Sequence, residues 1–318
     1  MILVIGGFGW VGSNTTEALL ERGQDCVITW HENHDVPAFL QGQLDRRLFL
    51  EPADATRFED LERIGRKYPI DGIVVAVGIF DPRAQGPIPG LRSYFDLLLS
   101  VFRAAETWKV KRVTFTSTVG VYLGLGPGPV KEDSPVPLSS PYALISYQKI
   151  VEIAATEFAR GSGVSAACVR LGGMFGPGQA PASPMLVTRL VHAAVRNEPV
   201  SLDGIFGGTS GKDASEVVYI KDLARAIALV QTAERLPHEV YNVGGDRRVR
   251  NREVLEAVKK AVPGFALDLP SGHGGASPIL LPSMDIERVK RDATYSPRFD
   301  LQSAVDNYIA WLRAGHAK

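Results

Sequence analysis

The chain has 318 residues, in which 35 Lys and Arg are balanced by 35 Asp and Glu. This length is enough to bury a large core in one large domain or in two closely joined ones. The balanced charge excludes a global electrostatic field that would draw the protein to nucleic acid or to an anionic membrane, so a partner must be recognised locally.

The first predicted element is the apolar strand Ile2–Ile5, which is followed by a glycine-rich turn at Gly6–Gly12 and a helix over Val11–Arg22. Glycine at every third position lets the backbone turn tightly and approach a pyrophosphate, while the first amides of the helix point at the anion. Glycine is common in this chain, so the glycine spacing alone is weak evidence for a dinucleotide site. Its position between a strand and a helix predicts dinucleotide binding rather than a merely structural turn.

Strand-length apolar runs then alternate with segments of helical periodicity. The further strands are predicted at Cys26–Trp30, Arg47–Leu50, Gly72–Val77, Arg112–Thr116 and Ser165–Leu171. The helices between them are predicted at Arg57–Lys67, Arg92–Trp108 and Pro141–Arg160. Such alternation predicts an α/β fold with a Rossmann-type, doubly wound parallel sheet that binds ligands at the carboxyl ends of its strands.

After residue 171 this rhythm breaks into loops rich in Gly and Pro, which predicts a smaller C-terminal substrate-binding part. We expect a dinucleotide-binding domain over residues 1–171, to which 215–248 return, and a substrate-binding part formed by 172–214 and 249–318. Two strands of the returning segment are predicted at Val217–Ile220 and Glu239–Val243. Three helices of the smaller part are predicted near Pro184–Arg196, Asn251–Ala261 and Leu301–Ala314.

The two cysteines, Cys26 and Cys168, stand in short apolar runs typical of interior strands, which favours a reducing compartment. The first residues lack a basic leader with a cleavage site, and no apolar stretch approaches the ~20 residues of a membrane span. A cytoplasmic protein without a membrane partner is therefore expected. The six histidines are scattered, so no metal site is predicted.

Several motifs are spread over nearly the whole chain. Besides the glycine turn they are Ala53-Asp54-Ala55, Val77-Gly78, Phe115–Thr118 with Val121-Tyr122, Arg170–Pro177, Tyr219–Ala224 and Tyr241–Gly244. Together they resemble the extended short-chain dehydrogenase/reductase family, which includes the NAD-dependent sugar epimerases and dehydratases. The resemblance implies an NAD(P)-dependent oxidoreductase, or an epimerase or dehydratase that oxidises its substrate transiently.

By this resemblance Asp54 would accept a hydrogen bond from the adenine amine and Ala55 would offer its backbone, although a helix N-cap is the alternative for Asp54. Lys149 would bridge the ribose hydroxyls, and an exposed helix lysine is its alternative. The candidate cofactor residues are Gly6, Phe8, Gly9, Trp10, Val11, Gly12, Trp30, His31, Asp54, Ala55, Ala76, Val77, Gly78, Lys149, Leu171 and Gly173.

The end of the second strand selects between NAD and NADP, because a carboxylate there binds the ribose 2'-hydroxyl and repels a 2'-phosphate. Trp30 and His31 stand at this point. The missing carboxylate and a histidine that can donate to phosphate favour NADP slightly, whereas Glu32 argues for NAD.

Enzymes of this family place a tyrosine four residues before a lysine on one helix, where the ammonium lowers the phenol pKa. This chain has no Tyr-x-x-x-Lys. Alignment on Lys149 puts Ile145 at the tyrosine position, whereas alignment on Ser-Pro-Tyr selects Tyr142 and puts Ser146 at the lysine position. Thr118 matches the family hydroxyl. The candidate catalytic residues are therefore Thr118, Tyr142 and Lys149, with packing as an equal alternative for Tyr142.

Two further departures concern the substrate. Tyr94 stands where family members carry an asparagine, and Ser215 stands where an arginine grips the nucleotide diphosphate. Without that arginine a diphosphate loses its main bidentate partner, so a small hydroxyl or carbonyl compound is expected rather than a sugar nucleotide. A non-redox or catalytically impaired protein that binds NAD(P) as a sensor or structural cofactor, or a tyrosine-independent lyase or isomerase, is the alternative.

The helices predicted at Arg92–Trp108 and Pro141–Arg160 are apolar on more than one face. The resemblance implies that they form the interface of a homodimer, and burial against the sheet accounts for part of the pattern.

Overall fold

The structure, a computed structural model, describes residues 1–31, 36–77, 87–245, 247–271 and 281–316. Its larger lobe is built on a seven-stranded sheet in the order β10-β6-β5-β4-β1-β2-β3, with every neighbouring pair parallel. The strands are β1 (Ile2–Ile5), β2 (Cys26–Trp30), β3 (Leu48–Pro52), β4 (Gly72–Val75), β5 (Arg112–Thr118), β6 (Ser165–Leu171) and β10 (Val240–Val243). This order confirms the predicted Rossmann-type sheet.

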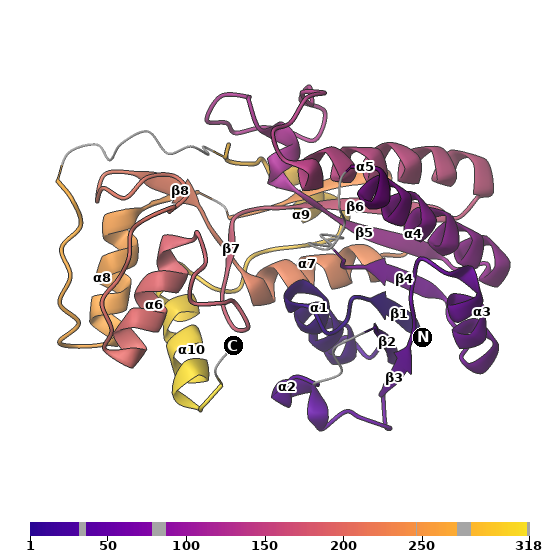
Figure 1. Ribbon diagram of the computed structural model, residues 1–318, viewed down its shortest axis with the longest axis horizontal. Coiled ribbons are helices and arrows are strands. Elements are labelled where there is room, and N and C mark those ends of the chain that lie inside the picture. Colours follow the sequence, from indigo (N-terminus) through magenta and orange to yellow (C-terminus); the bar gives the residue numbers. More distant parts are fainter. Residues whose placement is uncertain (32–35, 78–86, 246, 272–280, 317–318) are drawn as a thin grey trace.

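Helices cover both faces of the sheet (Figure 1). One face carries α1 (Trp10–Glu21) and α7 (Ile220–Thr232), which pack on each other. The other carries α3 (Phe58–Lys67), α4 (Pro87–Trp108) and α5 (Ala143–Ser162). The sheet is therefore buried between two apolar layers, and central strands such as β1 and β4 are almost uninterrupted hydrophobic runs.

The smaller lobe lies beside the sheet and contains three longer helices (Figure 1). These are α6 (Leu186–Arg196), α8 (Asn251–Ala261) and α10 (Leu301–Arg313). The remaining short helices are α2 (Ala38–Gln41), the 3-10 helix η1 (Val119–Tyr122) and α9 (Glu287–Asp292). The remaining strands form two small sheets. One pairs β7 (Met174–Phe175) with β9 (Val218–Tyr219), and the other pairs β8 (Ala214–Glu216) with β11 (Arg248–Arg250). No helix of the described segments combines the length and apolarity that a membrane span needs.

The two strands predicted to return to the sheet have different outcomes. Residues 240–243 form β10 beside β6, as predicted. The prediction for Val217–Ile220 is wrong, because Val218 and Tyr219 pair with Met174 and Phe175 in a separate two-stranded sheet. The next residue, Ile220, already begins α7, so the apolar run forms a two-residue strand outside the main sheet and then the start of a buried helix.

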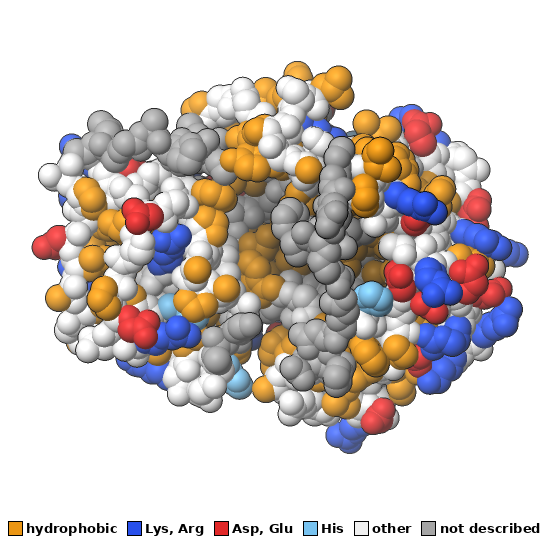
Figure 2. All heavy atoms as spheres, viewed as in Figure 1, with side chains coloured by type: hydrophobic (Ala, Val, Ile, Leu, Met, Phe, Trp, Pro, Cys, Tyr) orange, Lys and Arg blue, Asp and Glu red, His pale blue; other side chains and the backbone are white. Residues whose placement is uncertain are grey.

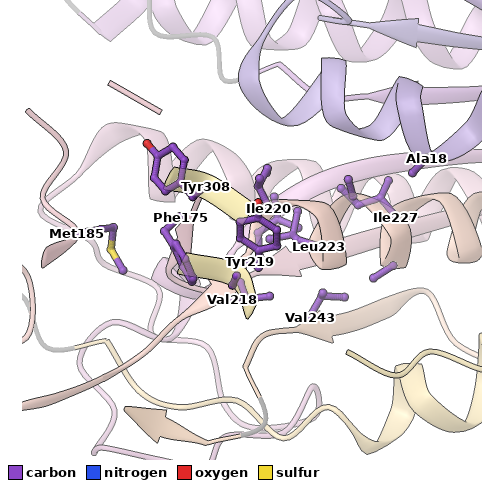
Figure 3. Packing of buried hydrophobic residues seen from close by; sticks show 14 of the residues in the cluster. Ala18, Phe175, Met185, Val218, Tyr219, Ile220, Leu223, Ile227, Val243 and Tyr308 are labelled. Atoms are coloured by element: carbon purple, nitrogen blue, oxygen red, sulfur yellow. The ribbon is translucent and has the colours of Figure 1, made fainter. Parts of the chain in front are cut away.

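The lobes share one hydrophobic core. A single cluster of buried side chains runs from α1 and α7 into the smaller lobe, where Phe175, Tyr219 and Tyr308 lie close together (Figure 3). The ring centroids of Phe175 and Tyr219 are 5.4 Å apart. The position of the smaller lobe relative to the sheet is thus fixed by apolar packing as well as by chain connections.

Candidate nucleotide and substrate site

The glycine turn between β1 and α1 has the geometry of a phosphate cradle. Gly6 has φ +82°, and a Cβ at Gly12 would lie 2.1 Å from the Gly6 carbonyl oxygen. A Cβ at Gly6 would lie 2.5 Å from Val77 Cγ1 at the end of the neighbouring strand. Larger residues would force the turn open, so the chain fits a dinucleotide whose pyrophosphate approaches the main chain closely.

Helix α1 begins at Trp10, with Gly9 as its N-cap. Gly9 has no side chain to cap the helix, and the first turn carries no acidic residue. An anion at this end of α1 would meet the helix amides and the positive end of the helix dipole without competition from a carboxylate in the first turn.

Asp54 follows β3, where its Oδ1 accepts hydrogen bonds from the Thr56 amide at 3.0 Å and from the Thr56 hydroxyl at 2.6 Å. The N-cap of α3 is Arg57, so Asp54 forms a turn ahead of the helix and does not cap it. Contact with adenine stays a prediction for Asp54 and Ala55.

At the end of β2 the Trp30 carbonyl oxygen accepts the Ala53 amide at 2.9 Å, and His31 is exposed. Ala76 and Val77, which follow β4, are half-buried. Gly78, the next predicted cofactor residue, lies outside the described residues, as does Glu32.

Thr118 is the last residue of β5, in register with Leu171 at the end of β6. Its Oγ1 accepts the Gly120 amide at 3.1 Å and so caps η1. This bond uses a lone pair of the hydroxyl oxygen, so it leaves the hydroxyl proton able to donate to another acceptor.

Ile145 lies in the first turn of α5 beside this hydroxyl. A Cβ at Gly120 would lie 2.8 Å from Ile145 Cδ1 and 3.3 Å from Thr118 Oγ1, so the two side chains border the same point. The structure therefore favours the alignment on Lys149, with an aliphatic side chain where the family carries its phenol. Tyr142 is the N-cap of α5 and is 41% exposed.

Lys149 is buried, with 8% of its surface exposed. Its ammonium donates to the carbonyl oxygens of Pro137 and of Ser139, the latter at 3.3 Å. Burial lowers the pKa of Lys149, and the nearby Glu152 carboxylate opposes that shift. The exposed-lysine alternative is wrong, because main-chain carbonyls hold this ammonium inside the fold.

A buried polar network below the site is a feature that sequence reasoning missed. The Glu152 carboxylate accepts two hydrogen bonds from the Arg170 guanidinium, at 2.9 and 2.6 Å, and one from the Ser117 hydroxyl at 2.5 Å. Arg170 also contacts the fully buried Tyr122, whose pKa is raised by burial. These bonds fix α5 to the ends of β5 and β6. In the sequence, the feature that could have indicated a buried polar network is an arginine within the apolar run of β6.

A small pocket of about 20 Å³ borders Val119, the residue that follows Thr118. Val119, Gly173, Met185 and Phe206 are among the residues that line it, and Ser215 also faces it. Figure 2 shows that the molecule is hollowed between the lobes, with hydrophobic side chains on the visible walls. Phe175 is buried and lines a separate cavity of about 450 Å³.

Tyr94 and Tyr147 lie away from the pocket. Their ring centroids are 4.4 Å apart across the contact of α4 with α5, and Tyr94 is buried. Among the described residues, no three His, Cys, Asp or Glu side chains are grouped as a metal site would require.

Comparison with known proteins places this geometry in a family. The family model described as "NAD dependent epimerase/dehydratase family" matches residues 2–244. The chain belongs to this family. Membership confirms the resemblance drawn from the motifs and the prediction of an NAD-linked enzyme.

The similar proteins are distant in sequence but match over the whole length. A putative UDP-glucose 4-epimerase of Methanocaldococcus jannaschii is 23% identical over 98% of each chain, and a dTDP-glucose 4,6-dehydratase of Actinoplanes is 25% identical over 99% of this chain and 98% of the relative. A Thermus thermophilus UDP-glucose 4-epimerase solved with NAD has a TM-score of 0.78 at 21% identity, covering 98% of each chain. A Thermotoga maritima epimerase solved with UDP-glucose has a TM-score of 0.80 at 20% identity, covering 99% of each.

The site keeps some of the motifs on which the family resemblance rests and departs from others. The cradle between β1 and α1 has the form that a dinucleotide needs, and Thr118 and Lys149 are present. In the alignment on Lys149, Ile145 stands where the resemblance implies a phenol paired with the lysine, and in the alignment on Ser-Pro-Tyr that phenol is Tyr142.

Proposed function

We propose that the chain is an NAD(P)-dependent oxidoreductase, or an epimerase or dehydratase that oxidises transiently, acting on a small hydroxyl or carbonyl compound. The observation that carries the proposal is the glycine cradle at the start of α1, where any side chain at Gly12 would collide with Gly6. The bound nicotinamide would supply hydride transfer. The protein would bind the pyrophosphate, orient the substrate and move a proton.

In this proposal Thr118 donates a hydrogen bond to the reacting oxygen of the substrate, and Tyr142 exchanges the proton. Lys149 orients the nicotinamide ribose by exchanging its bonds to the carbonyls of Pro137 and Ser139 for ribose hydroxyls. The 41% exposure of Tyr142 leaves its phenol accessible from solvent.

The substrate class rests on the side chains around the small pocket. Ser215 stands where the family arginine grips a diphosphate, and its hydroxyl is packed against Gly207, where a Cβ would lie 2.0 Å from Ser215 Oγ. Met185 and Phe206 make the wall apolar. These residues favour a compact, partly apolar compound, whereas the names of the relatives argue for a sugar nucleotide.

The preference for NADP is a finer part of the proposal. Neither Trp30 nor His31 offers a carboxylate to a ribose 2'-hydroxyl, and the exposed His31 is free to approach a 2'-phosphate. The relatives solved with NAD argue for the other form.

A second candidate, nucleotide binding without turnover, is favoured by Ile145. An aliphatic side chain beside Thr118 cannot transfer a proton, and loss of a general acid or base costs about 10²- to 10⁴-fold in rate. A lyase or isomerase reaction that needs no tyrosine is also consistent with an aliphatic side chain at position 145.

We also propose that the protein is a homodimer formed through α4 and α5. Phe95 and Leu99 on α4 and Ile153 on α5 are 46%, 64% and 65% exposed. The two helices lie side by side on the outside of the molecule (Figure 1), so a second copy would cover these side chains.

The test is calorimetric titration with NAD(H) and NADP(H), followed by turnover assays. Small alcohols and ketones are screened by nicotinamide absorbance, and UDP-glucose by product analysis. Nucleotide binding with turnover of a small compound is expected. Binding without turnover of any compound selects the second candidate, turnover of UDP-glucose alone overturns the substrate class, and absence of binding overturns the whole proposal.

A further inference from the structure

The side chain of Trp10 joins the phosphate turn to the smaller lobe. Its Nε1 donates to the Pro177 carbonyl oxygen at 2.6 Å, across 167 positions of sequence. The indole also packs against Gly178, where a Cβ would lie 2.8 Å from Trp10 Cδ1. Trp10 is the first residue of α1, so one residue contributes its amide to the turn and its ring to the opposite loop.

The loop that receives the indole, residues 176–179, is firmly attached at its other end. The Gln179 carbonyl oxygen faces His192 Nε2 at 3.2 Å and accepts the Tyr308 hydroxyl at 3.4 Å, which links the loop to α6 and α10. The Gln179 side chain donates to the Met174 carbonyl oxygen at 3.3 Å and accepts the Thr188 hydroxyl. Trp10 therefore holds a segment that moves with the smaller lobe rather than an independent loop.

The same loop leads to the wall of the small pocket. Met185, the N-cap of α6, lines the pocket and would contact a Cβ at Gly173 at 3.1 Å. Figure 3 shows Met185 on the same side of the core as Phe175 and Tyr308. Static contacts thus run from Trp10 through residues 177–179 to α6, whose N-cap Met185 lines the pocket.

We propose that Trp10 is a positioning residue that couples dinucleotide binding at the glycine turn to the placement of residues 176–190, and so to the shape of the substrate pocket. The inference rests on the proposed nucleotide site. Seating a pyrophosphate on the first amides of α1 fixes the Trp10 backbone, and the indole then restrains the Pro177 carbonyl. Thermodynamic linkage makes this coupling reciprocal. If bound nucleotide raises the equilibrium constant for ordering the loop by some factor, an ordered loop raises nucleotide affinity by the same factor.

The experiment is hydrogen–deuterium exchange on the full chain, with and without saturating NAD⁺ or NADP⁺. In the wild type, nucleotide should slow exchange in two segments, residues 6–14 and residues 176–190. In Trp10→Phe, which keeps a ring but loses the N–H, nucleotide should slow exchange only in the first segment. Exchange of the second segment without nucleotide should become about two- to tenfold faster, as expected for one lost neutral hydrogen bond.

Matched variants separate the contact from general effects. Trp108→Phe removes an indole that packs on α3 at Gly65 and should leave both segments as in the wild type. Gly178→Ala places a Cβ against Trp10 at φ +89° and should reproduce Trp10→Phe. Gly264→Ala introduces the same kind of backbone strain, at φ +96°, but nothing lies within 4 Å of the added atom. This variant should leave exchange in both segments as in the wild type.

Equal slowing of residues 176–190 by nucleotide in the wild type and in Trp10→Phe overturns the coupling. Slowing of neither segment in the wild type overturns the nucleotide site and this inference with it. The two failures are distinguished by the behaviour of residues 6–14.

Discussion

Ile145 leaves no room for a side chain at Gly120, where a Cβ would come within 2.8 Å of Ile145 Cδ1. The position four residues before Lys149 therefore faces the end of β5, which is the place of the phenol in a Tyr-x-x-x-Lys pair. In the alignment on Lys149, an aliphatic side chain therefore occupies the position that the resemblance gives to the phenol.

Restoring that phenol should raise activity. In Ile145→Tyr the new hydroxyl lies beside Thr118, so the rate with any compound turned over in the screen should rise about 100-fold, the low end of what a positioned general acid contributes. Nucleotide affinity, measured by calorimetry, should stay within about twofold, because the cradle is untouched. Leu144→Tyr is the control, since Leu144 is 38% exposed at the start of α5. A rate that does not rise in a folded, nucleotide-binding Ile145→Tyr variant contradicts this account of the site.

Tyr142 is the residue that would supply the proton in the wild type. We expect Tyr142→Phe to abolish redox activity and to spare cofactor affinity, because only a terminal hydroxyl is removed from a side chain at the helix N-cap. Tyr147→Phe is a matched control, as its ring packs on Tyr94. An unchanged rate in Tyr142→Phe rules out the proposed role.

Gly12→Ala tests the cradle directly. A methyl group 2.1 Å from the Gly6 carbonyl oxygen pushes the turn away from the pyrophosphate. Loss of two hydrogen bonds to a charged group, at about 1.5 kcal/mol each, corresponds to roughly 100-fold weaker nucleotide binding. Gly42→Ala is the control, because nothing lies within 4 Å of a Cβ there. Thermal unfolding checks that both variants fold, and wild-type affinity in a folded Gly12→Ala protein would place the nucleotide elsewhere.

Much of the fold was predictable from the sequence because the sheet is covered on both faces. Strands such as Ile2–Ile5 and Ser165–Leu171 are buried along their length and have the predicted bounds. Helix α7 was missed for the same reason. It is buried on most sides between α1 and the sheet, so it lacks the polar face that reveals a surface helix.

The site was less predictable because its decisive contacts join distant segments. The glycine turn follows from local pattern, and Thr118 was proposed from the family resemblance. The capture of Lys149 by the Pro137 carbonyl depends on how the loop before α5 folds back, and the bond from Trp10 to Pro177 depends on the placement of the smaller lobe. Neither contact leaves a spacing in the sequence that could be recognised.

Cofactor choice is tested at the end of β2. In Trp30→Asp a carboxylate stands where it can accept a hydrogen bond from a ribose 2'-hydroxyl and repel a 2'-phosphate. NADPH should bind at least about tenfold more weakly than to the wild type, while NADH binding is kept or improved. Fluorescence titration of the reduced nucleotides measures both affinities. Equal losses for NADH and NADPH would mean that this position supports the fold and does not discriminate the 2'-phosphate.

The dimer proposed through α4 and α5 predicts a concentration-dependent change of mass. Leu99→Asp places a carboxylate in the centre of the apolar surface, and two-fold symmetry repeats the change on both copies. Burial of one leucine side chain is worth about 1.5–3 kcal/mol, so the dimer should dissociate at least about tenfold more readily in sedimentation experiments. Leu138→Asp is the control, because Leu138 is 92% exposed in the loop before α5 and lies outside both helices. A wild-type protein that sediments as a monomer at micromolar concentration contradicts the dimer, and equal dissociation of the two variants would move the interface toward the loop.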